Sequence, residues 1–210
     1  MEGNLHCPDK GSLPFECVHL DHYGPLECPG HRQRYVLEVI DAFTKFVKLY
    51  PVTSTRSDEL IKHLTTYFNT YSAPKRVVND RGSAFTSQKF KEFLAQYVGR
   101  HILVATPHAN GQIERTNRSL TSILAKLTKA QSRWKDVLAE AEFALNNTVN
   151  RSTGDTPARL LFGTNQVGRT NDELRVILER QNQKDRDLGE IRANAVTQMK
   201  VSDTYSIAVL

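Results

Sequence analysis

Three acidic residues stand at the ends of short apolar segments, where their side chains could act together. Asp21 follows CVHL, Asp80 follows RVVN and Glu114 follows ANGQI. Each lies where a predicted strand stops or a predicted helix begins, so a rigid scaffold can aim the three carboxylates at one point. Carboxylates gathered in this way hold Mg²⁺ or Mn²⁺, and a pair of such ions assists displacement at a phosphorus atom. The three residues therefore predict metal-dependent phosphoryl-transfer chemistry.

Each of these residues also has a structural interpretation. Asp21 and Asp80 precede turn sequences, where aspartate commonly bonds its own backbone. Glu114 lies in the first turn of a predicted helix, where the helix dipole favours a negative charge. Asp41 is a rival for the site because it also ends an apolar segment, but the following Ala42-Phe43-Thr44 is typical of a turn, and we interpret Asp41 as structural.

Hydrophobic periodicity predicts the elements that must position these residues. Strands are expected over 15–21, 35–41, 46–52, 76–79 and 102–104. Helices are expected after a cap at Thr55 or Ser57, after a cap at Ser87, over 112–127 and 134–149, and from Pro157 to a stop at Gly163. This order predicts an α/β fold with one mixed sheet flanked by helices.

The last part of the chain changes character. Segments 172–182 and 185–200 are charged with sparse apolar positions, which predicts helices that pack on the core or on a partner. The final VSDTYSIAVL is expected either to begin another module or to fray. We therefore divide the chain into an N-terminal linker (1–13), a compact domain (14–165) and a helical C-terminal extension (166–210).

Composition bounds the function classes. The chain has 210 residues, 39% of them hydrophobic, and a net charge of +5, which favours a polyanionic partner. No apolar run approaches the roughly 20 residues of a membrane helix, and the start lacks the apolar core of a secretory signal. Three cysteines suggest no disulfide framework. We expect a cytosolic or nuclear protein without a membrane partner.

The motifs, taken in order, resemble the integrase catalytic core of retroviruses and, more closely, of gypsy-type LTR retrotransposons. The resemblance runs from about Pro14 to Gly163. Its motifs are DHYGP (21–25), YVLEVIDAFTKFVKLYPV (35–52), NDRG (79–82) with FTS (85–87), NGQIER (110–115), and NN (146–147) with STGDTPARLLFG (152–163). It implies a ribonuclease-H-like, mixed five-stranded sheet flanked by helices. In that fold the first strand pairs with the fourth, which would bring Asp21 beside Asp80.

The resemblance also implies a function. Family members are nuclear polynucleotidyl transferases that process the 3′ ends of retroelement DNA and join them to target DNA. Asp21, Asp80 and Glu114 match the catalytic metal ligands, which hold two Mg²⁺ or Mn²⁺ ions. DNA and further copies of the chain are the implied partners, with self-association through helices over 112–149 or after residue 170.

Five residues near Glu114 are expected to bind DNA: Asn110, Gly111, Arg115, Asn117 and Arg118. Asn110 matches a polar residue in the family's flexible loop, and Gly111 gives that loop mobility. Arg118 is four residues after Glu114 and shares its helix face, which places a cation where a phosphate would lie. A plain Glu114–Arg118 surface ion pair is the alternative.

Histidines are not expected in the catalytic set, although His19, His22 and His108 lie near the motifs. His19 lies two residues before Asp21, on the same face of the predicted strand, and is interpreted as packed. His22 is interpreted as a turn residue. With metal ions to activate water, no protein base is required.

Two features depart from the family. Only 33 residues separate Asp80 from Glu114, fewer than is usual, and neither the family's His-His-Cys-Cys zinc module nor a C-terminal DNA-binding barrel is recognisable. The alternative hypothesis is thus an inactive, host-adopted or decayed remnant that binds nucleic acid or protein. A metal-dependent nuclease that cuts without joining is a third hypothesis.

Overall fold

The fold is built on one mixed sheet. The structure, a computed structural model, describes residues 11–26, 32–104, 111–128, 133–168 and 187–208. Five strands run in the order β3-β2-β1-β4-β5, with β1 antiparallel to β2, β2 antiparallel to β3, and β4 parallel to both β1 and β5. Their bounds are β1 Cys17–Tyr23, β2 Tyr35–Asp41, β3 Val47–Val52, β4 Arg76–Asn79 and β5 Arg100–Leu103. This arrangement confirms the predicted ribonuclease-H-like sheet.

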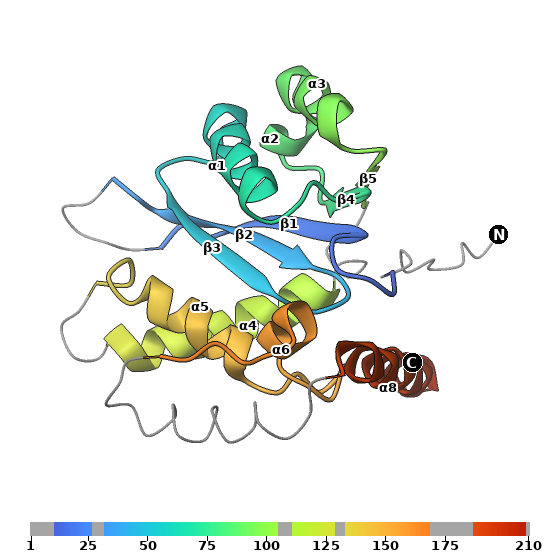
Figure 1. The fold of residues 1–210 in the computed structure, drawn as a ribbon. Helices are drawn as coiled ribbons and strands as arrows, with labels where there is room; N and C mark the ends of the chain where they lie inside the picture. Colours follow the sequence, from blue (N-terminus) through green and yellow to red (C-terminus); the bar gives the residue numbers. More distant parts are fainter. Residues whose placement is uncertain (1–10, 27–31, 105–110, 129–132, 169–186, 209–210) are drawn as a thin grey trace.

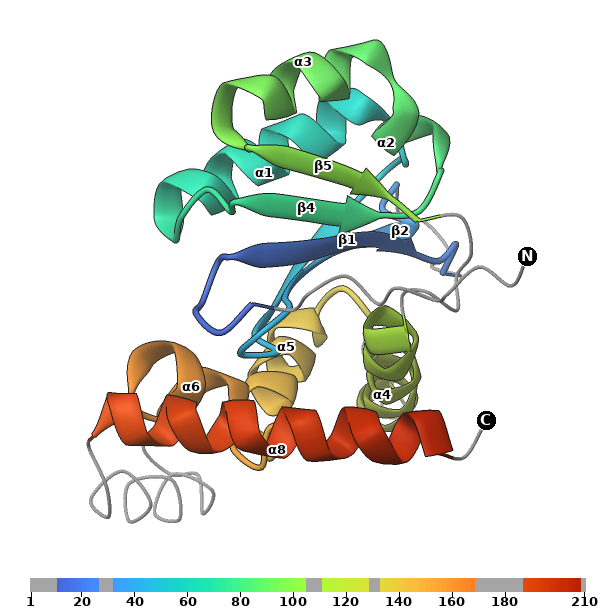
Figure 2. The same cartoon turned by 90° about the vertical axis from the view of Figure 1, so that its right-hand side faces the viewer.

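Helices cover both faces of the sheet (Figures 1 and 2). One face carries α1 Ser57–Thr70, α2 Ser83–Thr86 and α3 Gln88–Tyr97; the other carries α4 Gly111–Leu127 and α5 Leu138–Asn147. Beyond α4 and α5 lie α6 Pro157–Phe162 and α8 Leu188–Ala208. In Figure 2, α8 runs across the bottom of the molecule, below α4, α5 and α6. The two helical layers follow from alternation along the strands, which sends successive side chains to opposite faces.

Two apolar clusters result from that alternation. The first joins the sheet to α1–α3 and includes Val18, Leu20, Leu37, Val39, Leu64, Phe68, Phe90 and Phe93. The second joins the sheet to α4 and α5 and includes Val36, Ile40, Leu49, Leu120, Leu124, Trp134 and Ala141. The helices are therefore fixed to the sheet by large buried side chains on both sides.

Two predicted helix caps are confirmed and one is wrong. Ser87 Oγ accepts a hydrogen bond from Phe90 N at 3.2 Å, and Thr156 Oγ1 caps α6, which ends at the left-handed Gly163. Neither Thr55 nor Ser57 caps α1. Instead Glu59 reaches back and accepts bonds of 2.8–3.0 Å from the backbone and hydroxyls of the two residues before Thr55.

Some element bounds also differ from the prediction. Helix α5 begins at Leu138 rather than at Trp134, because the segment 134–137 forms turns that bury Trp134 in the second cluster. Helix α8 continues to Ala208, so residues 201–208 extend a helix instead of starting a module. The predicted helix over 172–182 lies outside the described residues. None of the described helices is long and apolar enough to cross a membrane.

Helix α5 also bonds to the outer edge of β3. The Asn146 amide accepts a bond from Val47 N and donates one to Val47 O, both at 2.8 Å. Glu142 Oε2 accepts a bond from Leu49 N at 2.8 Å, and its other oxygen pairs with Lys48 Nζ at 2.7 Å. Side chains of a helix thus satisfy backbone groups that another strand would otherwise pair.

Candidate functional site

Asp21 and Asp80 are brought together by the parallel pairing of β1 and β4. In this register His19 lies opposite Val78. Two residues further along each strand, Asp21 and Asp80 occupy the next positions on the same face of the sheet. Burial raises the pKa of Asp21, and the charge of Asp80 raises it further, while hydrogen bonds from Asn117 and His22 oppose the rise. The two carboxylates therefore interact electrostatically.

Helix α4 holds Asp21 in place from the other side. Asn117 Nδ2 donates to Asp21 Oδ2 at 3.1 Å, and the backbone N–H of His22 donates to Asp21 Oδ1 at 2.8 Å. One turn further along α4, Thr121 Oγ1 lies 2.7 Å from the Tyr23 hydroxyl. These contacts fix α4 against the end of β1 and set the direction of the Asp21 carboxylate.

The turn after β4 sets the direction of Asp80. Gly82 N donates to Asp80 Oδ1 at 2.9 Å, and a Cβ added at Gly82 would lie only 3.0 Å from that oxygen. Asn79 Nδ2 donates to the Asp80 carbonyl at 2.7 Å, and His101 Nε2 lies 2.9 Å from Asn79 Oδ1. A side chain at position 82 would therefore require the Asp80 carboxylate to shift by a few tenths of an ångström.

Glu114 lies in the first turn of α4 and is half-buried. It precedes Asn117 by three residues, a spacing that places two side chains on neighbouring parts of a helix surface. Among the described residues, no three His, Cys, Asp or Glu side chains converge closely enough to hold a metal ion. The fold thus pairs Asp21 with Asp80 and brings the helix of Glu114 beside them, without closing a three-ligand site.

The side chains where β1 and β4 end suit a hard divalent cation. The donors are carboxylate and amide oxygens, which Mg²⁺ and Mn²⁺ prefer. Asn117 Oδ1 is buried and has no hydrogen-bond partner among the residues that the structure describes, although its amide nitrogen bonds Asp21. A cation or its bound water would satisfy this buried oxygen beside two interacting carboxylates.

Glu38 is a further carboxylate here that the sequence reasoning missed. It lies directly opposite Asp21 in the β1–β2 register and is 0% exposed. In the described part of the chain neither of its oxygens has a hydrogen-bond partner. Burial, with a smaller contribution from the charge of Asp21, raises the pKa of Glu38 well above the ordinary value. The available signal was an ionisable residue within the apolar run VLEVI (36–40).

The interpretation of His22 as a turn residue was wrong, because it lies within β1 and faces away from Asp21. Its ring lies 5.1 Å from that of Phe85, and burial lowers its pKa to about 4. His22 is therefore neutral at pH 7. His19 is buried, and His108 lies outside the described residues.

The structural interpretation of Asp41 is confirmed. Its Oδ1 accepts bonds of 2.7 Å from both the backbone N–H and the hydroxyl of Thr44, and its Oδ2 accepts one of 2.7 Å from Phe15 N. The carboxylate is completely buried and closes the turn between β2 and β3.

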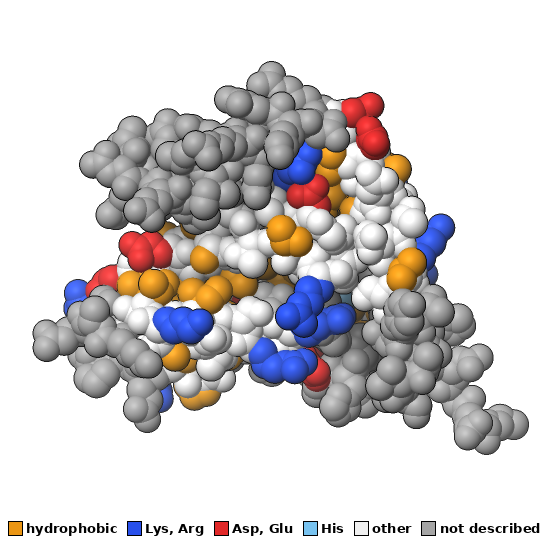
Figure 3. Space-filling view, turned by 90° about the horizontal axis from the view of Figure 1, so that it is seen from below, with side chains coloured by type: hydrophobic (Ala, Val, Ile, Leu, Met, Phe, Trp, Pro, Cys, Tyr) orange, Lys and Arg blue, Asp and Glu red, His pale blue; other side chains and the backbone are white. Residues whose placement is uncertain are grey.

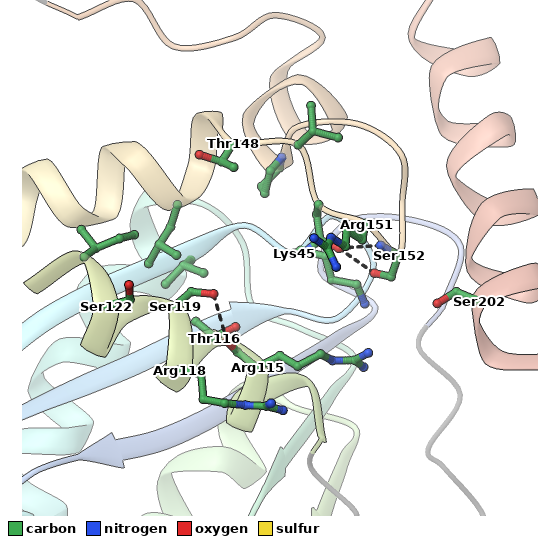
Figure 4. Close-up of a pocket in the computed structure, with 16 residues that line it drawn as sticks. Lys45, Arg115, Thr116, Arg118, Ser119, Ser122, Thr148, Arg151, Ser152 and Ser202 are labelled. Carbon is green, nitrogen blue, oxygen red and sulfur yellow. Dashed lines mark hydrogen bonds between the residues drawn. The ribbon is translucent and has the colours of Figure 1, made fainter. Parts of the chain in front are cut away.

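The expected DNA-binding residues fall in different places. Asn110 lies outside the described residues, and Gly111 is the first residue of α4. Asn117 bonds Asp21, whereas Arg115 and Arg118 are exposed and line a groove of about 900 Å³ along α4 (Figure 4). Within the described part of the chain, Arg118 forms no ion pair with Glu114, so the alternative of a surface ion pair is not realised there.

Comparisons with known proteins agree with this geometry. Residues 12–108 match the family described as Integrase core domain. The chain is 34% identical over 160 residues to the Pro-Pol polyprotein of simian foamy virus type 3, covering 74% of this chain and 14% of that protein. It is 26% identical over 170 residues to human gypsy retrotransposon integrase-like protein 1, covering 79% of this chain and 32% of that protein. The chain thus spans only a small part of these relatives.

Solved structures show the same fold. The HTLV-2 integrase catalytic core domain, determined in complex with magnesium, superposes with a TM-score of 0.59 at 23% identity, covering 71% of this chain and 97% of that one. A chain of the simian T-cell lymphotropic virus intasome, in complex with PP2A regulatory subunit B56 gamma, gives a TM-score of 0.64 at 20% identity, covering 78% and 60%. This chain therefore contains an integrase core domain of the family found in retroviruses and gypsy-type retrotransposons.

Proposed function

We propose that this chain is a polynucleotidyl transferase that processes the 3′ ends of retroelement DNA and joins them to target DNA in the nucleus. The observation that carries the proposal is the β1–β4 pairing, which aligns Asp21 with Asp80 while Asn117 fastens α4, the helix of Glu114, to Asp21. This arrangement has the donor chemistry that phosphoryl transfer requires.

In this proposal Asp21, Asp80 and Glu114 hold Mg²⁺ or Mn²⁺. Two such ions would lower the pKa of the attacking water or 3′-hydroxyl and stabilise the departing oxygen. Nearby groups orient the ligands. Asn117 and the backbone N–H of His22 fix Asp21, and the backbone N–H of Gly82 fixes Asp80. His22 cannot take up the proton at pH 7, since its pKa is about 4 and its ring is packed on Phe85.

DNA would approach along α4. Arg115 and Arg118 are exposed cations just beyond Glu114, and Arg118 has no ion pair within the described residues. Arginine in this position binds phosphate oxygens and positions the strand without reading its sequence. Joining two DNA ends to one target requires two active sites, so we propose that the chain acts as a homo-oligomer.

The test is a strand-transfer assay with a labelled duplex bearing a recessed 3′ end, a supercoiled target and Mn²⁺. The wild-type chain is compared with the Asp80→Asn/Glu114→Gln double variant and with Asp58→Asn, an exposed carboxylate that pairs with Lys89 on the opposite side of the sheet. Joined products are expected for the wild type and the Asp58 variant, and none for the double variant. Thermal unfolding with and without Mn²⁺ gives a second readout, because the metal should stabilise only proteins that keep the carboxylates.

A DNA- or protein-binding module without catalysis is the second candidate, favoured by the absence of a converged three-ligand group among the described residues. DNA binding without cleavage or joining, equal in the wild type and the double variant, would replace the transferase proposal with this one. Cleavage without joining would instead indicate a metal-dependent nuclease.

A further inference from the structure

The groove along α4 starts next to Glu114 and continues onto another side of this helix. Its first wall is formed by Arg115, Arg118, Ser119 and Ser122. Ser119 and Ser122 follow Glu114 by five and eight residues, about 140° and 80° round the helix axis at 100° per residue. The groove therefore begins beside Glu114 and leads away from it along the helix.

The opposite wall is the turn after α5. It includes Thr148, Arg151 and Ser152, and Ser202 of α8 closes one end (Figure 4). The turn is held by Asn150, whose Oδ1 accepts bonds from the backbone N–H and the hydroxyl of Ser152 at 3.0 and 2.7 Å. Arg151 thus projects from an ordered turn, and it is exposed.

Positive charge dominates the groove. Its lining contains arginine and lysine but no Asp or Glu among the described residues. The nearest acidic residues of α5 and the following turn already have cationic partners, since Glu142 pairs with Lys48 at 2.7 Å and Asp155 with Arg159 at 3.4 Å. Figure 3 shows lysine and arginine side chains gathered on the face that carries the groove. This charge pattern is complementary to a polyanion.

The hydroxyls narrow the class of polyanion. Ser119, Ser122, Thr148 and Ser152 line both walls between the arginines. Serine, threonine and arginine are among the side chains that contact phosphate and sugar oxygens in protein–DNA complexes. From Arg115 to Ser122 the helix rises about 10 Å, which matches roughly three nucleotides of a duplex strand.

We infer that this groove binds a stretch of nucleic-acid sugar-phosphate backbone, with Arg151 and Ser152 on one wall and the Ser119–Ser122 side of α4 on the other. The inference rests on the proposed function, because the groove starts beside Glu114 and continues the path of a strand held there. Arg151 is a phosphate-binding residue in this arrangement and takes no part in the chemistry.

The test is DNA binding measured by fluorescence anisotropy in EDTA over a series of KCl concentrations, so that no metal-dependent reaction contributes. Arg151→Gln is compared with Arg100→Gln, an exposed arginine on β5 at the far edge of the sheet. Arg151→Gln is expected to weaken binding about fivefold near physiological salt and to reduce the slope of log K against log[KCl] by about 0.9, the change for one lost phosphate contact. Arg100→Gln should leave both quantities unchanged.

Equal effects of the two substitutions, or no effect of either, would overturn the inference. A competition with polyglutamate separates nucleic acid from acidic protein: displacement of DNA by polyglutamate at matched charge, lost in Arg151→Gln, would assign the groove to an acidic peptide instead. Failure of strand transfer with the Arg151 effect intact would refute only the proposed function. Normal strand transfer with no Arg151 effect would refute only the groove.

Discussion

Strand β2 carries two completely buried carboxylates three residues apart, and they face opposite sides of the sheet. Asp41 lies on the α1–α3 side and accepts three hydrogen bonds of 2.7 Å. Glu38 lies on the α4–α5 side, opposite Asp21, and accepts no hydrogen bond from the described residues. Burial raises the pKa of both groups. Hydrogen bonds from Thr44 and Phe15 partly offset the rise in the pKa of Asp41, whereas the charge of Asp21 raises the pKa of Glu38 further.

This difference in hydrogen bonding means that the Asp41 carboxylate stabilises the fold, whereas the Glu38 carboxylate lowers its stability. A buried charge without hydrogen bonds is unfavourable by several kcal/mol unless it is neutralised or paired. The α1–α3 side satisfies its carboxylate within the fold. The α4–α5 side gathers Asp21, Glu38 and the unbonded Asn117 Oδ1 around the candidate metal site, so its polar groups remain available to a cation.

The largest expected effect comes from removing the satisfied carboxylate. Asp41→Ala leaves the N–H groups of Thr44 and Phe15 without partners in a buried turn, and should lower the free energy of unfolding by about 3 kcal/mol or more. Urea denaturation measures the change. Asp41→Asn keeps one acceptor and should lose less, so equal losses for the two variants would contradict the hydrogen-bond explanation.

Removing the unsatisfied carboxylate should have the opposite sign. Glu38→Leu replaces an unpaired buried acid by an apolar side chain of similar size among Val36, Ile40 and Leu49, and should raise the free energy of unfolding at pH 7 by about 1–3 kcal/mol. Glu38→Gln, which keeps an unbonded polar group, should gain less. Destabilisation by Glu38→Leu would show that Glu38 has a partner which the described residues do not include.

The gain from Glu38→Leu should also depend on pH. The folded-state pKa of Glu38 is raised above 4.5, so the folded protein binds more protons than the unfolded chain, and the stability of the wild type falls as pH rises from 4.5 through the folded pKa. The advantage of Glu38→Leu should therefore be largest at high pH and shrink as pH falls towards 4.5. Urea denaturation of both proteins at pH 5 and pH 8 tests this, and a pH-independent difference would contradict it.

The smallest stability effect is expected from removing the hydrogen bond between Asn117 on α4 and Asp21 on β1. Asn117→Ala removes one hydrogen bond to Asp21 from a half-buried position, which should cost about 1 kcal/mol or less. Strand transfer should fall much more than stability, because Asp21 loses the group that orients it. Parallel changes in the two measurements would give Asn117 a purely structural role.

Most of the sheet could be predicted because its strands carry strong local signals. A run rich in Val, Ile, Leu and Tyr located β2 correctly, and the short apolar Val77-Val78 pair located β4. Ser87 and Thr156 lie where a short hydroxyl side chain can cap a helix. The cap of α1 was missed because Glu59 acts from inside the helix and bonds backward, which no preceding cap residue announces. His22 was misplaced because β1 continues past Asp21, held by its pairing with β2.

The candidate site was predictable only in part. Asp21 and Asp80 stood out because acidic residues interrupt apolar strands at turn sequences. Glu38 did not, since a single acid inside VLEVI suggests a position at the surface, and only the register with Asp21 shows that it is buried beside the site. Residue spacing could not show that Asn117 bonds the Asp21 carboxylate, because that contact depends on how α4 packs against β1.

The bonds between α5 and β3 also have a consequence for contacts between sheets. In β3, Val47, Leu49 and Pro51 direct their backbone groups away from β2; the first two N–H groups are taken by Asn146 and Glu142, and proline has none. An unpaired edge strand is a template for intermolecular sheet growth and aggregation. This edge offers no free N–H over those three positions, so β3 is not a template on which the sheet of another copy could add a strand.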